Sequence, residues 1–296
     1  MDPIAPAPLD RLTIRGLVQA ALAEDGAEQD LTSNALVPVD QQGRGVVVAK
    51  SDGVVCGLQF ALETFYAVEP RVRWMPAVSE GLRVASGATL AHIDGPLHAI
   101  LRGERVALNY LQRLSGIATQ TADCVRATAG THCRILDTRK TTPGLRPAER
   151  YAVRVGGGYN HRNDLRSAIL VKDNHIAAVR ARGGSLAEAV RLAHDAAGPA
   201  TAVEVEVTSL QELREAIAAG ARALLLDNFT PPALHPAVAE AQQHSVITEA
   251  SGGITPDTIA DYAASGVDFI SIGALTHTVT PMDISLQVVP EPLSSI

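Results

Sequence analysis

The chain of 296 residues has few aromatic residues, few cysteines and no excess of basic charge, and each shortage excludes a class of function. Aromatic residues make up 3% of the sequence, and the formal net charge is −7. Nucleic-acid-binding proteins usually present a basic surface and rings that stack on bases, so we exclude nucleic acid as the main partner. The three cysteines are odd in number and show no Cys-x-x-Cys spacing, which disfavours a disulfide framework and a zinc site.

Long apolar runs and a secretory signal are also missing. No apolar run approaches the roughly 18 residues that a membrane span needs. The first residues, Met1 to Pro8, lack the basic and apolar stretches of a secretory signal, and we interpret them as a short disordered tail. We therefore expect a cytoplasmic protein without a membrane partner. With 46% hydrophobic residues, the chain can bury a large core in one or two domains.

Lysine is scarce, with three residues against 22 arginines. Two of the three, Lys140 and Lys172, stand in short polar runs beside apolar strands, at Asp137 to Gly144 and at Leu170 to His175. Lysine offers a compact charge with three rotatable donors, where arginine offers a planar fork. The natural partners of such groups are phosphate and carboxylate oxygens. These two lysines therefore predict an active site that handles anions.

The first hundred residues mix one helix with short strands, a texture that predicts an α+β domain. We expect the helix at Leu12–Ala23. Gly45–Ala49 and Val54–Cys56 flank Ser51-Asp52-Gly53, which predicts a hairpin. Further strands are expected at Val72–Met75 and Thr89–Ile93. A long helix, Glu104–Ala127, follows because its apolar residues repeat at three- to four-residue spacing.

From Arg134 onward, apolar strands alternate with helices. We predict strands at Ile135–Leu136, Ala168–Val171, Ala202–Val207, Ala223–Leu226, Val246–Thr248 and Asp268–Ile272. We predict helices at Leu186–Ala197, Leu210–Ala219, Pro232–Gln242 and Pro256–Ser265. The strands are continuous apolar runs, as expected where both faces of a parallel sheet are buried. Because six strands are fewer than a complete barrel contains, we predict a truncated α/β barrel.

Polar residues gather at or just past the C-terminal ends of these strands. They are Arg139, Lys140, Lys172, Asp173, Asp227, Asn228, Ser251 and Ser271. In α/β barrels this edge carries the active site. Residues 134–175 also contain nine Arg or Lys residues against four Asp or Glu, and the Gly156–Gly158 run before His161 and Arg162 predicts a tight local geometry. An ordinary surface ion-pair network is the alternative.

Glu204 and Glu206 lie on the same side of one apolar strand, because side chains alternate along a strand. Charges at such positions cost free energy unless they are paired, bound to a metal or functional. Asp227 ends the next strand and is a candidate to share a cation with Glu206. Mg²⁺ suits this arrangement, since it is usually held by one or two carboxylates and substrate phosphates. A structural ion pair is the alternative for either glutamate.

Two turns of small residues, Ser251-Gly252-Gly253 and Ser271-Ile272-Gly273, each close a predicted strand. Such turns offer backbone N–H groups to a phosphate, and the last strand ends of a barrel are a usual place for one. Turns of small residues are common, so a purely structural role is the alternative.

Five segments resemble the quinolinate phosphoribosyltransferase family, the decarboxylating nicotinate-nucleotide pyrophosphorylases of NAD biosynthesis. They are Glu-Arg-Val-Ala-Leu-Asn-Tyr-Leu-Gln-Arg-Leu-Ser-Gly-Ile-Ala-Thr from Glu104, Asp-Thr-Arg-Lys-Thr-Thr-Pro-Gly from Asp137, Gly-Gly-Gly-Tyr-Asn-His-Arg from Gly156, Leu-Val-Lys-Asp-Asn-His from Leu170 and Leu-Leu-Leu-Asp-Asn-Phe from Leu224. Together and in this order they are highly specific, and the resemblance covers nearly the whole chain.

The resemblance implies a subunit of two domains. Residues 1–115, joined by the C-terminal tail 276–296, are expected to form an α+β open-faced sandwich, and residues 116–275 an incomplete α/β barrel. The resemblance also implies a homodimer, or a hexamer, in which Arg105 completes the active site of the partner subunit.

The resemblance further implies transfer of the phosphoribosyl group of phosphoribosyl pyrophosphate to quinolinate, with decarboxylation to nicotinate mononucleotide. It assigns quinolinate binding to Arg139, His161, Arg162 and Lys172, with Thr138 beside them and Lys140 between the two substrates. Glu206 and Asp227 match the family's acidic pair near the ribose and Mg²⁺, and with Lys140 and Lys172 they form the expected catalytic set. The phosphate-binding loops are matched by Ser251, Gly252, Gly253, Ser271, Ile272 and Gly273. Many members have Ser-Gly-Asn at the first of these loops, and we expect Gly253 to cause little loss because backbone N–H groups bind the phosphate.

Two other functions fit parts of the pattern. A related enzyme would act on nicotinate without decarboxylation, or on the unknown substrate of molybdenum-associated relatives, but the cationic set suits a dicarboxylate better. A non-enzymatic module that binds phosphosugars would need the phosphate loops, but neither the acidic pair nor the second cationic cluster. Similarity of fold alone does not separate these functions.

Overall fold

A computed structural model describes residues 7–198 and 200–292. The tail expected at the N-terminus lies mostly outside these ranges, as do the last four residues of the tail 276–296. The chain divides into two compact units. Unit 1 holds the described residues of Met1–Ala122, Thr141–Gly157 and Leu275–Ile296, and unit 2 holds those of Asp123–Lys140 and Gly158–Ala274. Residues 141–157, which we had assigned to the second domain, therefore pack in unit 1.

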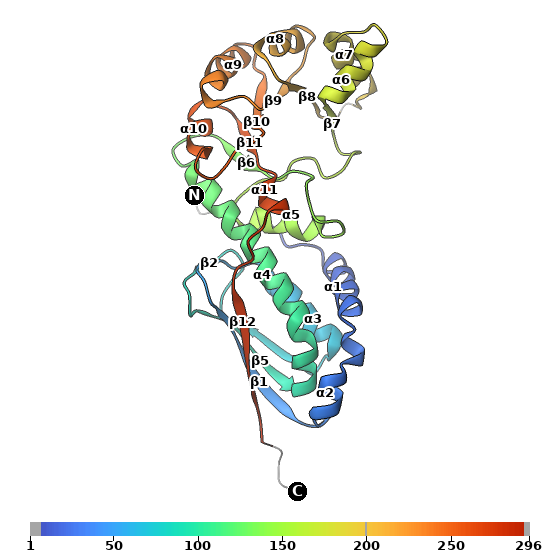
Figure 1. Ribbon diagram of the computed structural model, residues 1–296, viewed down its shortest axis with the longest axis vertical. Coiled ribbons are helices and arrows are strands. Elements are labelled where there is room, and N and C mark those ends of the chain that lie inside the picture. Colours follow the sequence, from blue (N-terminus) through green and yellow to red (C-terminus); the bar gives the residue numbers. More distant parts are fainter. Residues whose placement is uncertain (1–6, 199, 293–296) are drawn as a thin grey trace. The chain divides into compact units, whose positions relative to one another are not determined.

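Unit 1 contains an antiparallel sheet with helices against it (Figure 1). Its strands, in spatial order, are β12 (Ile284–Pro290), β1 (Gln42–Ala49), β5 (Thr89–Pro96) and β3 (Arg73–Pro76). Its helices are α1 (Arg11–Asp25), η1 (Ala27–Gln29), α2 (Leu31–Leu36), α3 (Leu58–Val68), most of α4 (Leu97–Ala127), α5 (Arg146–Val155) and most of α11 (Ala274–His277). The α+β texture expected for this part is confirmed.

The sheet of unit 1 buries alternate residues of β1, including Val47 and Ala49, against the helices. The rings of Phe65 and Trp74 stack in the same core, with centroids 5.5 Å apart. Helix α1 begins where the Asp10 carboxylate accepts the N–H groups of the first turn, and it ends at a left-handed glycine, as expected from capping chemistry.

The hairpin predicted around Ser51-Asp52-Gly53 is wrong. Strand β1 has a neighbour on each edge, β5 and β12, so no edge is left for the segment that follows it. That segment forms β2 (Gly53–Val54), which pairs with β4 (Arg83–Val84) in a separate small sheet. The Asp52 carboxylate accepts a 2.8 Å hydrogen bond from the Ser86 N–H and ties the connection to β4.

Unit 2 is a parallel sheet of six strands (Figure 1). In chain order they are β6 (Arg134–Leu136), β7 (Ile169–Val171), β8 (Val203–Val207), β9 (Ala223–Asp227), β10 (Ile247–Ser251) and β11 (Phe269–Ser271). Their spatial order is β6-β11-β10-β9-β8-β7, and every neighbouring pair is parallel. Within the described residues β6 and β7 occupy opposite edges of the sheet, so it does not close. The predicted incomplete barrel is confirmed.

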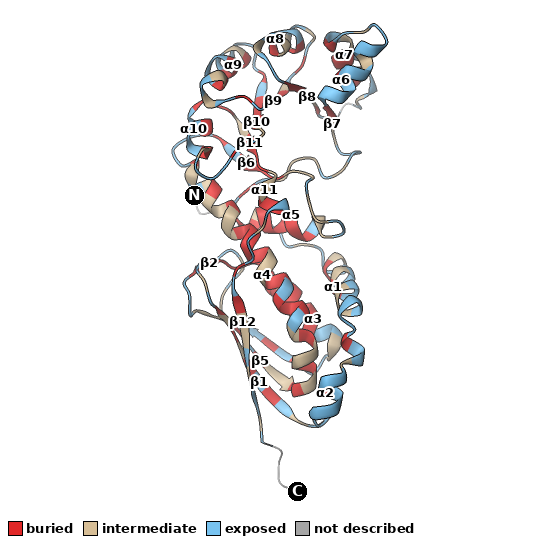
Figure 2. Cartoon of the chain, viewed as in Figure 1, coloured by how far each residue is buried: buried red, intermediate tan, exposed pale blue. Residues whose placement is uncertain are grey.

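The helices of unit 2 are α6 (Asp173–Ala181), α7 (Leu186–Ala196), α8 (Leu210–Ala218), α9 (Pro231–Gln243) and α10 (Ile259–Ala264). Figure 2 shows α6 as largely exposed, and Ile176 is its one buried residue. Sequence patterns did not predict α3, α5 or α6. No helix in the described part of the chain is long and apolar enough to cross a membrane.

The strand register separates two faces of the parallel sheet. Leu225 is the register partner of both Glu206 on β8 and Glu249 on β10, so these three side chains share a face. The neighbouring positions, Val205 and Leu224, are fully buried on the opposite face. The sheet therefore has one face of apolar side chains and one that carries carboxylates.

Candidate active site

The predicted site residues other than Arg105 all belong to unit 2. Thr138, Arg139 and Lys140 follow β6, Lys172 follows β7 as the N-cap of α6, Asp227 ends β9, Ser251 ends β10, and Ser271 ends β11. Because the strands are parallel, their C-terminal ends lie together along one side of the sheet, called the sheet edge from here on. Residues that are far apart in the sequence thus arrive at one edge.

Two lysines and two carboxylates influence one another at this edge. Nζ of Lys172 lies 3.3 Å from Oε2 of Glu206, whose side chain is only 9% exposed. Burial raises the pKa of Asp227, the Glu206 carboxylate raises it further, and the Lys172 and Lys140 ammonium groups act to lower it. The structure therefore brings together the four residues that we predicted as the catalytic set, and their roles stay predictions.

A buried carboxylate, Asp137, organises the segment that precedes His161. It accepts a 2.8 Å hydrogen bond from the His161 N–H and a 2.6 Å hydrogen bond from the Asn160 amide. Tyr159 pairs with the end of β6 through Ile135 and Asp137. The next turn is closed by Thr138, whose hydroxyl accepts the Lys140 N–H at 3.1 Å. Asp137 was not among the predicted site residues, although its place between an apolar strand and Arg139 was a signal.

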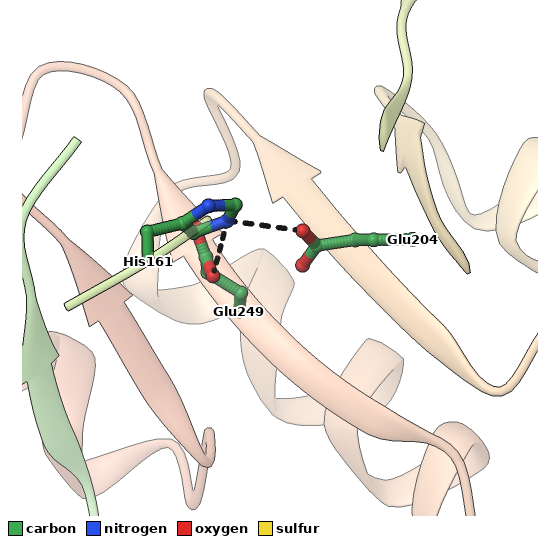
Figure 3. Close-up of side chains that lie close together, drawn as sticks. All are labelled: His161, Glu204 and Glu249. Carbon is green, nitrogen blue, oxygen red and sulfur yellow. Dashed lines mark hydrogen bonds and ion pairs between the residues drawn. The ribbon is translucent and has the colours of Figure 1, made fainter. Parts of the chain in front are cut away.

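Nε2 of His161 faces two carboxylates, that of the buried Glu249 and that of the partly buried Glu204 (Figure 3). Its Nε2 is 3.1 Å from Oε2 of Glu204 and 3.4 Å from Oε2 of Glu249. Burial lowers the pKa of His161, but the hydrogen bonds to both carboxylates outweigh burial and raise this pKa to about 10. Burial also raises the pKa of Glu204. Glu249 was missed, because a single glutamate inside the apolar strand β10 gave no spacing signal.

The spacing of His161, Glu204 and Glu249 would suit a metal ion, since their ligand atoms lie within 4.8 Å of one another. The other ring nitrogen argues against one. Nδ1 of His161 accepts the Arg162 N–H at 2.7 Å, whereas a metal-binding imidazole donates from its second nitrogen. Nε2 faces the two carboxylates and therefore carries a proton, where a metal would need the lone pair. We therefore do not interpret this cluster as a metal centre.

Two guanidinium groups lie within electrostatic reach of each other. Burial lowers the pKa of Arg162, and the charge of Arg139 lowers it further, while Glu204 acts in the opposite direction. Nη1 of Arg162 also donates to the Ala168 carbonyl at 3.1 Å. Two like charges beside each other favour an anion with two negative groups between them.

The predicted phosphate loops differ in what they offer. Gly252 has φ +94°, and a Cβ there would lie 2.2 Å from Oδ1 of Asn228, so only glycine fits. Asn228 donates its N–H to the Ser251 carbonyl and its side-chain amide to Asp227, and so links this loop to β9. At the second loop, the Ile272 N–H already donates to the Leu136 carbonyl at 3.1 Å. This N–H group is therefore engaged within the sheet.

The Gly156–Gly158 run has the tight geometry that was predicted, and its cause is close packing of Gly156 against helix α4. A Cβ at Gly156 would lie 2.5 Å from the Ala118 carbonyl oxygen of α4, and Gly157 has φ +89°. The remaining predicted residue, Arg105, lies exposed on α4 in unit 1. Its role in a partner subunit stays a prediction.

Family models match nearly the whole chain. Residues 30–115 match the N-terminal domain of quinolinate phosphoribosyl transferase, and residues 117–287 match its C-terminal domain. The chain belongs to the quinolinate phosphoribosyltransferase family. It is therefore an enzyme of a phosphoribosyl-transferring family, as the sequence motifs predicted.

Relatives in this family are similar over their full length. The probable nicotinate-nucleotide pyrophosphorylase (carboxylating) of Bacillus subtilis is 43% identical over 280 residues, which cover 95% of each chain. The corresponding protein of Homo sapiens is 42% identical and covers 94% of this chain and 93% of its own. A solved nicotinate-nucleotide pyrophosphorylase of Francisella tularensis is 38% identical, with a TM-score of 0.88 over 98% of this chain and 100% of that one.

Proposed function

We propose that this quinolinate phosphoribosyltransferase family member transfers the phosphoribosyl group of phosphoribosyl pyrophosphate to quinolinate, with release of pyrophosphate and CO₂. The product is nicotinate mononucleotide, a precursor of NAD. The observation that carries the proposal is the edge of the parallel sheet, where Lys140 and Lys172 meet Glu206 and Asp227. Arg139 and Arg162 add paired guanidinium groups to the same unit.

The charges of the two substrates fit this edge. Quinolinate has two carboxylates. Arg139 and Arg162 offer planar guanidinium groups to them, and Lys172 offers a compact ammonium group. The 5′-phosphate of the co-substrate fits the glycine turn after β10, where Gly252 and Gly253 both have positive φ values. Fixed cations and oriented N–H groups are worth most in a site from which water is excluded.

The reaction needs no covalent intermediate with the enzyme. The ring nitrogen of quinolinate attacks the anomeric carbon as pyrophosphate leaves, and positive charge develops on the ribose. The carboxylates of Glu206 and Asp227 stabilise this charge, and positioning of the two substrates supplies much of the rate acceleration. The carboxylate next to the quaternary nitrogen then leaves as CO₂. Its bonding electron pair stays on the ring carbon, where the adjacent positive nitrogen stabilises it, and a proton from solvent takes the place of the lost group.

Glu206 and Asp227 are also the residues proposed to hold Mg²⁺, together with phosphate oxygens. Their donor set fits, because Mg²⁺ prefers hard carboxylate oxygens and retains water and phosphate ligands. The raised pKa of Asp227, to which burial contributes most and Glu206 also contributes, marks a pair of carboxylates that a cation would stabilise. Bound Mg²⁺ would supply charge neutralisation for the leaving pyrophosphate. A titration of Mg²⁺ followed by calorimetry should lose binding in Glu206→Gln with phosphoribosyl pyrophosphate present.

We also propose a cytoplasmic homodimer whose sites are completed by Arg105. The exposure of Arg105 on α4 supports a contact with another subunit. The three cysteines are buried free thiols, which fits a reducing compartment. Sedimentation of the purified protein would contradict the dimer if it showed a monomer at working concentrations.

The decisive experiment supplies quinolinate, phosphoribosyl pyrophosphate and Mg²⁺ to the purified protein and measures CO₂ and pyrophosphate. We expect both products in equal amounts, and their loss when a chelator removes Mg²⁺. Pyrophosphate release from nicotinate without CO₂ would favour the monocarboxylate alternative. Binding of phosphoribosyl pyrophosphate without turnover of either base would favour the phosphosugar-binding module.

A further inference from the structure

Arg113 on α4 makes hydrogen bonds to two other stretches of unit 1. Its Nε and Nη2 donate to Oε1 of Glu149 on α5, at 2.9 and 2.6 Å. Nη2 also donates to the Thr142 hydroxyl at 2.6 Å and to the Thr276 carbonyl at 3.2 Å. Glu149 is fully buried, and its second oxygen accepts the Thr142 N–H at 3.0 Å. One guanidinium group therefore joins α4 to stretches 141–157 and 275–292.

Both of these stretches begin where the chain passes from unit 2 to unit 1, and these two places are called the crossings. Lys140 is the last residue before the first crossing, and Thr142 is the second residue after it. Ala274 is the last residue before the second crossing, and Thr276 is the second residue after it. Arg113 thus holds the chain directly after each crossing.

The residues before each crossing belong to the proposed active site. Arg139 and Lys140 precede the first crossing, and the loop Ser271–Gly273 precedes the second with one residue between them. Consecutive Cα atoms are about 3.8 Å apart, so an anchor at Thr142 keeps the Cα of Lys140 within about 8 Å of it. The same argument limits the loop before the second crossing. Each anchor therefore restricts where an active-site segment can lie.

The contacts of Arg113 go beyond what neutralisation of Glu149 requires. A single positive charge would stabilise the buried carboxylate, whereas the planar fork of arginine also supplies donors to both crossings. We propose that Arg113 is a positioning residue for the transfer reaction, which fixes Lys140 and the loop Ser271–Gly273 by holding the chain after each of them. This inference rests on the proposed function for the identity of the reaction.

The substitution Thr142→Val tests this role without breaking the buried ion pair. It removes the hydroxyl that accepts from Arg113 and keeps the branched shape, while Glu149 still pairs with Arg113. The turn after Lys140 then loses a hydrogen bond to a charged group, and we expect kcat for quinolinate to fall by about tenfold. Thr142→Ser keeps the hydroxyl and should retain about half of the wild-type kcat or more. A kcat of Thr142→Val within about twofold of the wild type would overturn the proposal.

Arg113→Lys removes the anchor at both crossings. Lysine keeps a positive charge beside Glu149 but lacks the planar fork. The matched control is Arg11→Lys, because Arg11 pairs with Glu63, another buried glutamate of unit 1, and neither residue belongs to the stretches that follow the crossings. We expect kcat to fall by about tenfold or more in Arg113→Lys and to stay at the wild-type value in Arg11→Lys. Two variants that differ from the wild type only in stability, with wild-type kcat per folded molecule, would contradict a positioning role.

Hydrogen exchange gives a readout that does not depend on turnover. Peptides spanning 138–144 and 272–278 should exchange about tenfold faster in Arg113→Lys than in Arg11→Lys, because local opening at the crossings is less restrained. The peptide 43–49 of β1 should exchange alike in both variants. Failure of the proposed function would appear as wild-type protein that does not turn over quinolinate, with this exchange difference intact. Equal exchange at the crossings in both variants, or faster exchange throughout unit 1 in Arg113→Lys, would overturn the positioning role.

Discussion

The ammonium group of Lys172, just after β7, lies 3.3 Å from the carboxylate of Glu206 on β8. The lysine side chain is about half exposed and the glutamate side chain is nearly buried, so the pair links a group in contact with solvent to a group inside the sheet. Lys172→Ala would leave the Glu206 charge without this partner. It would also remove a positive charge that is proposed to bind quinolinate. We expect turnover of quinolinate to fall by at least about 10²-fold with the fold intact, measured by initial rates and circular dichroism. Lys50→Ala removes an exposed lysine of unit 1 and should keep wild-type rates.

Lys140→Ala is expected to lose turnover of quinolinate in the same assay. The Lys140 ammonium group acts to lower the pKa of Asp227. The Lys140 N–H donates to the Thr138 hydroxyl, so the backbone that carries this charge is held in a turn. Loss of this ammonium removes positive charge between the two proposed substrates. Initial rates with saturating substrates should drop by about 10²-fold or more. Near-normal rates in this variant would argue against the assignment of the sheet edge as the active site.

Mixing of subunits tests whether Arg105 serves a partner. Arg105→Ala and Lys172→Ala should each be inactive as pure proteins. If one subunit donates Arg105 to the site of another, a mixture contains some sites with both residues intact. We expect partial recovery of CO₂ release after the two variants are unfolded and refolded together. A mixture as inactive as its components would show that Arg105 serves its own subunit or none.

The two glycines after β10 should respond differently to substitution. Gly252→Ala places a Cβ against Asn228 and strains a positive φ, so we expect a loss of about 1–3 kcal/mol in the free energy of unfolding, together with lower activity. Gly253 has φ +63° and no atom within 4 Å of a Cβ. Gly253→Asn should be nearly neutral, because asparagine tolerates this conformation. Chemical denaturation of the two variants checks the difference.

A buried ion pair holds the segment 141–157 in unit 1. Oε1 of Glu149 accepts two hydrogen bonds from Arg113, at 2.6 and 2.9 Å, and Oε2 accepts the Thr142 N–H at 3.0 Å. Glu149 is fully buried. Glu149→Ala leaves the Arg113 charge without its partner, and we expect a loss of about 3–5 kcal/mol in the free energy of unfolding. A loss below about 1 kcal/mol in urea denaturation would contradict this role of Glu149.

The same pair shows why one part of the organisation could not be read from the sequence. The six strands of unit 2 were predictable, because continuous apolar runs bounded by turns leave few alternatives. Segment 141–157 was placed in the wrong unit, since the partner of Glu149 lies 36 residues away and no local pattern links it to Arg113. The hairpin error has a similar origin. Strand β1 takes its partners from β5 and from the distant β12, and the sequence gives no sign of this choice.

For the site, the motifs predicted which residues share an edge, but not how they pair. Lys172 and Glu206 were both singled out, and their contact follows from adjacent parallel strands. Glu249 was not singled out, because only the folded sheet brings it into contact with His161.

The antiparallel pairing of β12 with β1, in which Ile284 lies opposite Ala49, has a consequence for synthesis of the protein. The ribosome synthesises β12 after all of unit 2, so the nascent chain must keep one edge of β1 unpaired until then. Unit 2 ends at Ala274 and can emerge completely before that edge is covered. Unpaired edges of this kind promote aggregation, so a chain shortened before Ile284 would expose β1 permanently.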